Sequence, residues 1–496
     1  MIVELRLDEQ RPRAWIGRMM TLGDGPHDAV RIKWAGAGRP RPRGLEALFE
    51  LERLVLRKGR PCGADAVDKD SLHTPAGTDQ EPDIIVDFTT TERDAIRSPR
   101  LYLRPLYNGS MGEDAALKAI LCGDLPRIEI RDEISGETVD AGQPSGETAD
   151  GLSGALDTVM ARTFTLLKAV LSGRPRCLQP DINVSGAGHP RSPASYVLLG
   201  LAEAIAKRIY RLCCYAPHWQ IGWRYTNDAG IWSSRDLSGS PWAIIADPGH
   251  RFYADPFPVT WQGRTFIFFE DLDHRVGKGV ISAVAFDGSG PSGPVTPVLE
   301  EPWHLSYPFL IEADGELWMI PESSANRDVA LYRCIKFPNQ WERHATLLSG
   351  LELSDATVVR HHERFYLFGA SRDGAGGFSD TLSIFHADHL SGPWMPHAGN
   401  PIMVDRSGAR PAGNFVTISG QLWRPVQDCS DGYGAALGLA QITELSPTSF
   451  RQSVRHILRP GGHWPGRKLH TLNRRGRLEM IDGSRIQPKW RIGNSE

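Results

Sequence analysis

The carboxy-terminal half of this chain repeats a hairpin pattern about every 50 residues, and this repeat constrains the fold more than any other feature. Three copies, which begin at Asp255, Tyr307 and Asp355, place a leading, a turn and a closing residue at offsets of 0, 8 and 15. Two looser copies begin at Arg410 and His470, so successive starts are 52, 48, 55 and 60 residues apart. Short strands at such a period are typical of β-propeller blades. Five copies therefore predict five blades, whereas a β-sandwich does not explain the shared register.

Two further regions complete the fold prediction. HWQIGWRYT at 218–226 can supply the strand that closes the ring of blades. In the amino-terminal third, strand-like and helix-like periods alternate, which indicates a small α/β domain. There we expect a strand at 83–88 and helices at 43–57, 113–123 and 152–171. The expected fold class is an α/β amino-terminal domain followed by an all-β five-bladed β-propeller. The expected boundaries are 1–175 for the α/β domain, 176–217 for a linker with an amphipathic helix, and 218–490 for the propeller.

Charge and hydropathy exclude several classes of protein. The chain has 496 residues and a formal net charge of -3, so it is not a broadly basic nucleic-acid binder. The most apolar stretch, near 194–216, contains Glu203, Lys207, Arg208 and Arg211 and does not predict a transmembrane segment. We interpret it as an amphipathic helix between domains, with interfacial membrane contact as the alternative.

The amino terminus and the cysteines indicate the compartment. MIVELRLDEQ lacks the apolar core of a signal peptide, and the seven cysteines are scattered without a CxxC pair. We therefore expect a cytoplasmic protein without a disulfide framework or a zinc ribbon. No metal site and no cofactor are predicted, and the sequence names no partner protein.

The shared register of the hairpins predicts a site. Residues 255 and 270 are equidistant from the Gln262–Gly263 turn, so we expect them to face each other across antiparallel strands. The first strand of each propeller blade lines the central axis, so the five leading residues should converge on one mouth. The ring of leading residues is Asp255, Tyr307, Asp355, Arg410 and His470, and just outside it we expect Glu270, Glu322, Ala370, Gln427 and approximately Asp482.

Polar residues at such positions are costly to bury unless they have a functional or structural role. A ligand-binding or catalytic site is one interpretation. In the other, Asp255 and Asp355 are simply the buried partners of Arg410 and His470. Several aromatic residues are also expected near this end, where they could stack on a sugar face or pack in the core: Trp303, His304, Trp318, Trp423 and Trp464.

The ordered motifs YADPFP, GRTFIFFED, HLSYPFL, GELWMIPES, RFYLF and ARPAG resemble one family closely. It is the propeller domain at the amino terminus of the plant glucosamine inositolphosphorylceramide transferases and of many bacterial proteins. The resemblance covers about 220–490. The plant proteins carry a separate glycosyltransferase domain after the propeller, so the resemblance implies no transferase activity here.

The propeller is also similar to the five-bladed furanosidase superfamily of glycoside hydrolases. That similarity implies an Asp base at the start of the first blade, a second Asp at the third and a Glu acid at the fourth. Asp255 and Asp355 match the first two positions, but Arg410 stands where the acid should be. Arg does not donate a proton near neutral pH. Glu322 or Glu270 could replace the acid, and Arg410 with His470 could instead hold a uronate or a sugar phosphate.

In the amino-terminal third, RLYLRPLYNGSMGEDAALKAILCG (100–123) and ETVDAGQ (137–143) are similar to the core of the formyltransferase fold. Enzymes with that fold use an Asn-x-His pair and an Asp. Aligned on Pro105, the pair falls at Ser98 and Arg100, while Asp140 matches the Asp. Without the Asn and the His, a degenerate domain is expected.

We therefore carry three functional hypotheses. The first is a carbohydrate-processing or carbohydrate-binding protein with a glycoside-hydrolase-like site, in polysaccharide or glycolipid metabolism, whose ligand is a glycan or a sugar phosphate. The second is a non-catalytic glycan-binding scaffold, and the third is a sugar N-formyltransferase; whether the chain is an enzyme stays open. The candidate catalytic residues are Asp255, Asp355 and Glu322. The candidate binding residues are Glu270, His304, Tyr307, Arg410, Gln427, Asp428 and His470.

Overall fold

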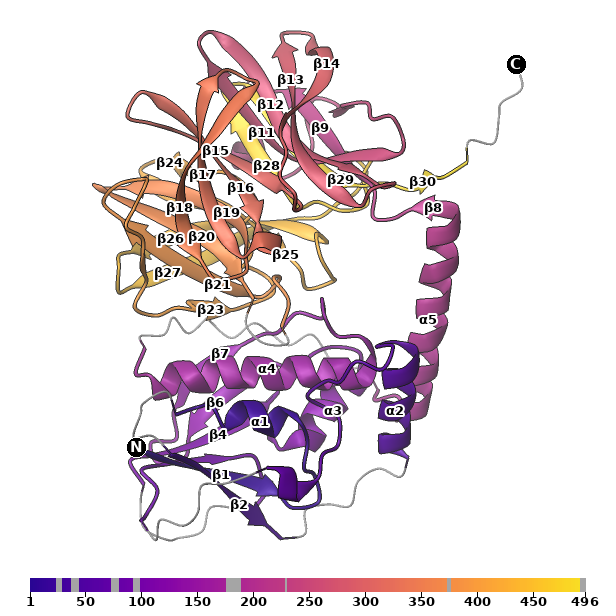
Figure 1. Ribbon diagram of the computed structural model, residues 1–496, viewed down its shortest axis with the longest axis vertical. Coiled ribbons are helices and arrows are strands. Elements are labelled where there is room, and N and C mark those ends of the chain that lie inside the picture. The colour runs from indigo at the N-terminus through magenta and orange to yellow at the C-terminus, as the bar shows by residue number, and fades with distance from the viewer. Residues whose placement is uncertain are drawn as a thin grey trace. The chain divides into compact units, whose positions relative to one another are not determined.

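The computed structural model describes residues 1–23, 29–36, 44–72, 80–91, 99–174, 189–227, 230–372 and 376–490 (Figure 1). The chain divides into two compact units. Unit 1 comprises Met1–Ala206 with Asp373–Gly377, and unit 2 comprises Lys207–Arg372 with Phe378–Glu496. None of the described helices combines the length and the apolar character needed to cross a membrane.

Unit 1 is built on one mixed sheet in the order β2-β1-β3-β4-β6-β7, with β5 beside β4. Strands β2, β1, β3 and β4 are parallel, whereas β6 and β7 run antiparallel. The strands are β1 (Ile2–Asp8), β2 (Ala29–Ala35), β3 (Ile84–Asp87), β4 (Leu101–Tyr107), β5 (Ser110–Met111), β6 (Ile128–Asp132) and β7 (Thr138–Gly142). The helices are α1 (Trp15–Met19), α2 (Leu45–Val55), α3 (Glu113–Leu121), α4 (Gly151–Leu171) and α5 (Pro193–Cys213). The predicted α/β class is confirmed.

The local sequence explains why these elements form. Strand β3 (IIVD) is buried throughout, as expected for a central parallel strand covered on both faces. Helix α4 lies across the sheet in Figure 1, and most of its side chains are buried. Its first turn is capped from α2, because the buried Glu52 carboxylate accepts the backbone N–H groups of Leu152 and Ser153 at 2.7 and 2.8 Å. A carboxylate is favourable there because a helix amino terminus carries partial positive charge.

Unit 2 is a five-bladed propeller, as predicted. The first blade is β11 (Arg251–Trp261), β12 (Arg264–Asp273), β13 (Lys278–Asp287) and β14 (Gly290–Leu299). The second is β15 (Ser306–Ala313), β16 (Glu316–Ser323), β17 (Asp328–Lys336) and β18 (Gln340–Ser349). The third is β19 (Leu353–His361), β20 (Arg364–Ser371), β21 (Thr381–Ala387), β22 (Met395–Pro396) and β23 (Met403–Val404). The fourth is β24 (Val416–Ile418), β25 (Gln421–Asp428), β26 (Ala436–Leu445) and β27 (Phe450–Leu458).

The fifth blade joins the two ends of unit 2. It combines β28 (Leu472–Arg475) and β29 (Leu478–Ser484) with β9 (Trp219–Tyr225) and β10 (Ala243–Ile244), in the order β10-β9-β29-β28. Strand β9 pairs antiparallel with β29 from Tyr225↔Leu478 to Trp219↔Ser484. The segment predicted to close the ring therefore does so.

The blade motif FIFFE owes its apolar run to burial on both faces of the sheet. Phe268 packs with Met319 and Tyr332 of the second blade. Its neighbours Ile267 and Phe269 point to the other face and pack with residues of the fifth blade, among them Ile221, Leu478 and Met480. Alternate side chains of one strand thus fill two inter-blade cores.

A β-bulge interrupts the innermost hairpin of three blades at the leading residue. Ala254 pairs with Glu270 and the ladder resumes at Phe257↔Phe268, so Asp255 and Pro256 together oppose one residue of β12; the same shift of one residue follows Ser306 and Ser354. The expectation that residues 255 and 270 stand directly opposite is therefore wrong by one residue. The leading residues Asp255, Tyr307 and Asp355 have φ angles of 52, 42 and 56°, a left-handed conformation that is uncommon for residues other than glycine and that Asp tolerates better than Tyr.

The closure of the ring can be tested at Gly222 of β9. A Cβ at this position would lie 2.3 Å from the Trp464 ring, which packs with Leu469, Leu472 and Ile481. We expect Gly222→Ala to lower the free energy of unfolding by about 1–3 kcal/mol in chemical denaturation, because an overpacked core forces neighbours to move. The matched control is Gly288→Ala, since a Cβ there meets nothing within 4 Å. Equal stability of the two variants would contradict the packing of β9 against Trp464.

Candidate functional site

The leading residues encircle one mouth of the propeller, and each blade contacts the next one there. The rings of Phe257 and Tyr307 lie 4.8 Å apart between the first two blades, and the Tyr307 hydroxyl lies 2.8 Å from the Thr357 hydroxyl of the third. Between the fourth and fifth blades, the backbone N–H of Leu472 donates to the carbonyl of Ala412 at 2.8 Å. The predicted convergence of the five inner strands is present in the structure.

Asp255 belongs to a buried network that joins the first blade to the fifth. The Thr471 hydroxyl donates to its carboxylate at 2.7 Å, and Nε2 of His470 lies 3.5 Å from the same oxygen. Nδ1 of His470 lies 2.6 Å from Asp482, which also accepts the backbone N–H groups of Asp255 at 2.7 Å and of Thr471 at 2.8 Å. Asp482 therefore links both ends of the ring.

Burial and neighbouring charges raise the pKa values of two members of this network, Asp255 and His470. Burial, with the nearby carboxylates of Asp482 and Asp355, raises the pKa of Asp255 well above its usual value, and His470 only partly opposes this. Burial lowers the pKa of His470, but Asp482 and Asp255 outweigh it and raise that pKa to about 9. His470 is therefore an imidazolium at neutral pH, and Asp255 holds its proton to a higher pH than an exposed aspartate does.

Asp355 is paired with the residue that stands where a glycosidase acid was expected. Nε of Arg410 donates to its carboxylate at 2.6 Å, and the Gln427 amide donates to the same oxygen at 3.0 Å. Burial raises the pKa of Asp355 to about 6, while Arg410 limits the rise. All three side chains are buried, so the alternative that Asp355 partners Arg410 describes the observed contact.

The second circle of residues supplies further carboxylates. Nε2 of His304 lies 3.3 Å from Glu270, while its Nδ1 accepts the backbone N–H of Gly279 at 3.0 Å, so the ring proton is directed at the carboxylate. Burial lowers the pKa of His304, but the interaction with Glu270 more than offsets this, so the net shift is upward. Glu322 accepts the backbone N–H of Asp355 at 3.2 Å, which holds it against the third blade.

Tyr433 is a mouth residue that the sequence analysis missed. The Arg410 guanidinium lies 4.7 Å from the centre of its ring, which also packs edge-on against His470 at 5.5 Å. Burial, opposed by Arg410, raises the pKa of Tyr433 well above its usual value. Its only sequence signal is a tyrosine between Gly432 and Gly434 in the loop after β25. Trp219 of β9 is a second missed residue, and it stacks on His470 with ring centres 4.0 Å apart.

The other candidate residues have varied surroundings. Asp428 is buried beside Gln427 and accepts the backbone N–H of Ser430 at 3.0 Å. Trp318 pairs with Ile311 near the hairpin turn, at the end of the blade away from the mouth, so its expected position is wrong. Trp423 pairs with Val416 near the turn of the fourth blade, so its expected position is wrong too. Trp423 and Trp464 are buried in one core cluster, as the packing alternative proposed.

Among the described residues, one group of side chains at the mouth could hold a metal ion. It consists of Asp255, His470 and Asp482, whose ligand atoms all lie within 4.8 Å of one another. In the structure, Nδ1 of His470 and both oxygens of Asp482 already form hydrogen bonds within the network. We therefore interpret the group as a proton-sharing network.

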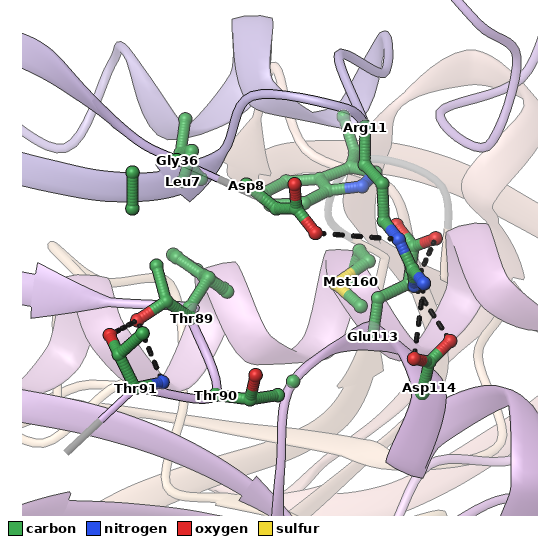
Figure 2. Close-up of a pocket in the computed structure, with 14 residues that line it drawn as sticks. Leu7, Asp8, Arg11, Gly36, Thr89, Thr90, Thr91, Glu113, Asp114 and Met160 are labelled. Atoms are coloured by element: carbon green, nitrogen blue, oxygen red, sulfur yellow. Dashed lines mark hydrogen bonds and ion pairs between the residues drawn. The ribbon is translucent and has the colours of Figure 1, made fainter. Parts of the chain in front are cut away.

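Unit 1 contains a pocket of about 650 Å³, counting the space open to solvent, at the carboxyl ends of β1, β2 and β3. This edge is where open α/β sheets bind ligands. Figure 2 shows Asp8, Arg11, Glu113 and Asp114 on one side and Thr89–Thr91 on the other, with Arg11 donating to Asp114 at 2.7 and 3.0 Å. Asp140, which is buried on β7, is not among the described residues that line it. Ser98 lies outside the described residues, so the formyltransferase resemblance stays a prediction.

Comparison with known proteins concerns the propeller. Residues 243–480 match the family model of glucosamine inositolphosphorylceramide transferase 1, N-terminal. The predicted family resemblance is confirmed. The Arabidopsis thaliana glucosamine inositolphosphorylceramide transferase 1 is 30% identical over 278 residues, which are 53% of this chain and 35% of the relative. The Oryza sativa subsp. japonica protein of the same name is 30% identical over 251 residues, 48% of this chain and 34% of the relative. The chain thus spans about a third of the length of these plant relatives.

Similar solved structures include glycoside hydrolases. Zg3597, a family 117 enzyme from Zobellia galactanivorans, is 12% identical with a TM-score of 0.35, over 49% of this chain and 77% of that one. The catalytic domain of the Coprinopsis cinerea GH62 α-L-arabinofuranosidase is 14% identical with a TM-score of 0.34, over 45% and 78%. Both similarities concern the fold alone.

The charge state of His470 predicts a pH dependence. Its folded pKa of about 9 lies above the ordinary value of 6.5, so its stabilising effect is complete below pH 6.5 and is lost as the pH rises through 9. We expect the stability difference between the wild type and His470→Gln to shrink by about 3 kcal/mol across this interval in urea unfolding at each pH. The control is His389→Gln, because His389 is exposed and its stability difference from the wild type should stay constant over the same pH range. A constant difference would show that His470 does not change its charge in this range.

A double-mutant cycle tests the pairing of Asp355 with Arg410. Arg410→Met leaves a buried carboxylate without its cation, so we expect a loss of about 3–5 kcal/mol in the free energy of unfolding. Adding Asp355→Asn should recover a large part of that loss, because the uncompensated charge is gone. Strictly additive effects in chemical denaturation would contradict the ion pair.

Proposed function

We propose that the mouth of the propeller binds a saccharide, with Asp255, Glu270, His304, Glu322 and Tyr433 as the contacting groups. The observation that supports this most strongly is the collection of carboxylates around one aromatic ring at the mouth. Carboxylates accept hydrogen bonds from sugar hydroxyl groups, and an aromatic ring packs on the apolar face of a sugar. The plant relatives, named as glycosyl-transferring enzymes, point to the same class of ligand.

The backbone at the mouth supports a ligand role as well. Three leading residues are held in left-handed bulges, although each of them bears a bulky or charged side chain. Such strain persists where the surrounding structure enforces it, and it is concentrated at functional sites.

The pairing of Asp355 with Arg410 favours binding over ordinary hydrolysis. The second carboxylate of the predicted catalytic set is neutralised by Arg410, and the fourth blade offers no acid at the expected place. A lost general acid costs roughly 10²–10⁴-fold in rate.

Hydrolysis is the second candidate, because Asp255 and Glu322 both border the mouth. In an inverting reaction, one carboxyl group protonates the departing oxygen while the other activates water. The raised pKa of Asp255 suits a proton donor, so in this arrangement Glu322 acts as the base. In the opposite assignment, Asp255 is the base, as the furanosidase similarity implies, and Glu322 substitutes for the acid that the fourth blade lacks.

A glycan array followed by turnover assays separates these functions. We expect the full chain to bind a subset of glycans and Asp255→Asn to weaken that binding at least tenfold, with Asp388→Asn, an exposed aspartate, as the control. Product release from the bound glycans that Asp255→Asn abolishes would establish hydrolysis instead. Binding that is unchanged in Asp255→Asn and in Tyr433→Ala would exclude the mouth as the site.

A further inference from the structure

Helix α5 exposes an apolar stripe along its length. Leu198, Ile205, Ile209 and Leu212 follow each other at spacings of seven, four and three residues, which places them on one face of a helix. Their exposed fractions are 63, 59, 57 and 64%. A continuous exposed stripe of this kind marks an interaction surface.

The second half of α5 is mainly basic beside this stripe and opposite it. It carries Lys207, Arg208 and Arg211 against one acidic residue, Glu203. The charge is local, because the whole chain has a formal net charge of -3.

Residues 487–490 lie against the end of α5. Strand β8 (Cys214–Tyr215), directly after α5, pairs with β30 (Gln487–Pro488). The Lys489 ammonium donates to the Arg211 carbonyl at 2.5 Å, and its backbone N–H donates to Cys213 at 2.9 Å. Trp490 therefore lies beside the end of the helix, and 67% of its surface is exposed.

Charge decides between the possible occupants. A second copy packed stripe to stripe would cover the apolar residues but would leave Lys207 and Arg211 pointing away from it, without a partner of opposite charge. An anionic lipid surface satisfies both faces, because acyl chains take the apolar stripe and head groups take the basic side chains. Tryptophan is also the residue that prefers the boundary between lipid and water.

We propose that α5, together with Trp490, binds the surface of an anionic membrane and lies in the plane of its head groups. The site is independent of the saccharide site at the propeller mouth. The helix does not span the bilayer, and the attachment is reversible, since one amphipathic helix without a lipid anchor binds weakly.

Co-sedimentation of the full chain with vesicles tests the proposal. We expect binding to vesicles of phosphatidylcholine mixed with phosphatidylglycerol, weaker binding at high salt, and little binding to phosphatidylcholine alone. Lys207→Gln with Arg211→Gln should reduce binding by about 25-fold, because each basic side chain contributes about fivefold.

The apolar stripe is tested with matched charge insertions. Ile209→Glu with Leu212→Glu should abolish binding, whereas Ile335→Glu with Met395→Glu should not, although these two residues are similarly exposed at 52 and 56%. Thermal unfolding checks that each variant is folded. Three results would overturn the proposal: no binding to anionic vesicles, equal binding to neutral ones, or a dimer in sedimentation equilibrium that the α5 variant dissociates.

Discussion

The mouth of the propeller depends on buried carboxylates that hold neighbouring blades together. Asp482 accepts a backbone N–H from the first blade and two further groups from the fifth, so one side chain closes the ring. Asp355 joins the third blade to the fourth through Arg410 and Gln427. A buried charge is costly unless all of its partners are present. The interactions that close the ring therefore also set the charge that a ligand meets.

The blades and their convergence were predictable, because both follow from the spacing of residues along the chain. Equal offsets in successive hairpins place the leading residues at the same ends of their strands, and strand β9 was recognisable by its apolar-aromatic pattern. The bulges at Asp255, Tyr307 and Asp355 were not predictable in this way. Each of these hairpins contains the same one-residue bulge, so the offsets between copies stay equal and the shift leaves no trace in the register.

The pairing of side chains at the mouth could not be predicted from the sequence, for a different reason. Whether Asp355 faces a ligand or Arg410 depends on rotamers and on the separation of two blades, and neither leaves a periodic signal. Tyr433 comes from a loop and not from a repeated strand, so the spacing of the hairpins does not predict its position. The pocket of unit 1 draws its residues from several separate segments that meet only after the parallel sheet has formed.

The central claim is that the ring of leading residues forms the wall of a saccharide site. The most direct measurement is a crystal structure of the full chain soaked with a glycan that it binds in solution. We expect sugar density at the mouth, within hydrogen-bonding distance of Asp255 or Glu322 and packed against Tyr433. Well-defined sugar density only elsewhere on the molecule, with the mouth unchanged, would contradict the claim.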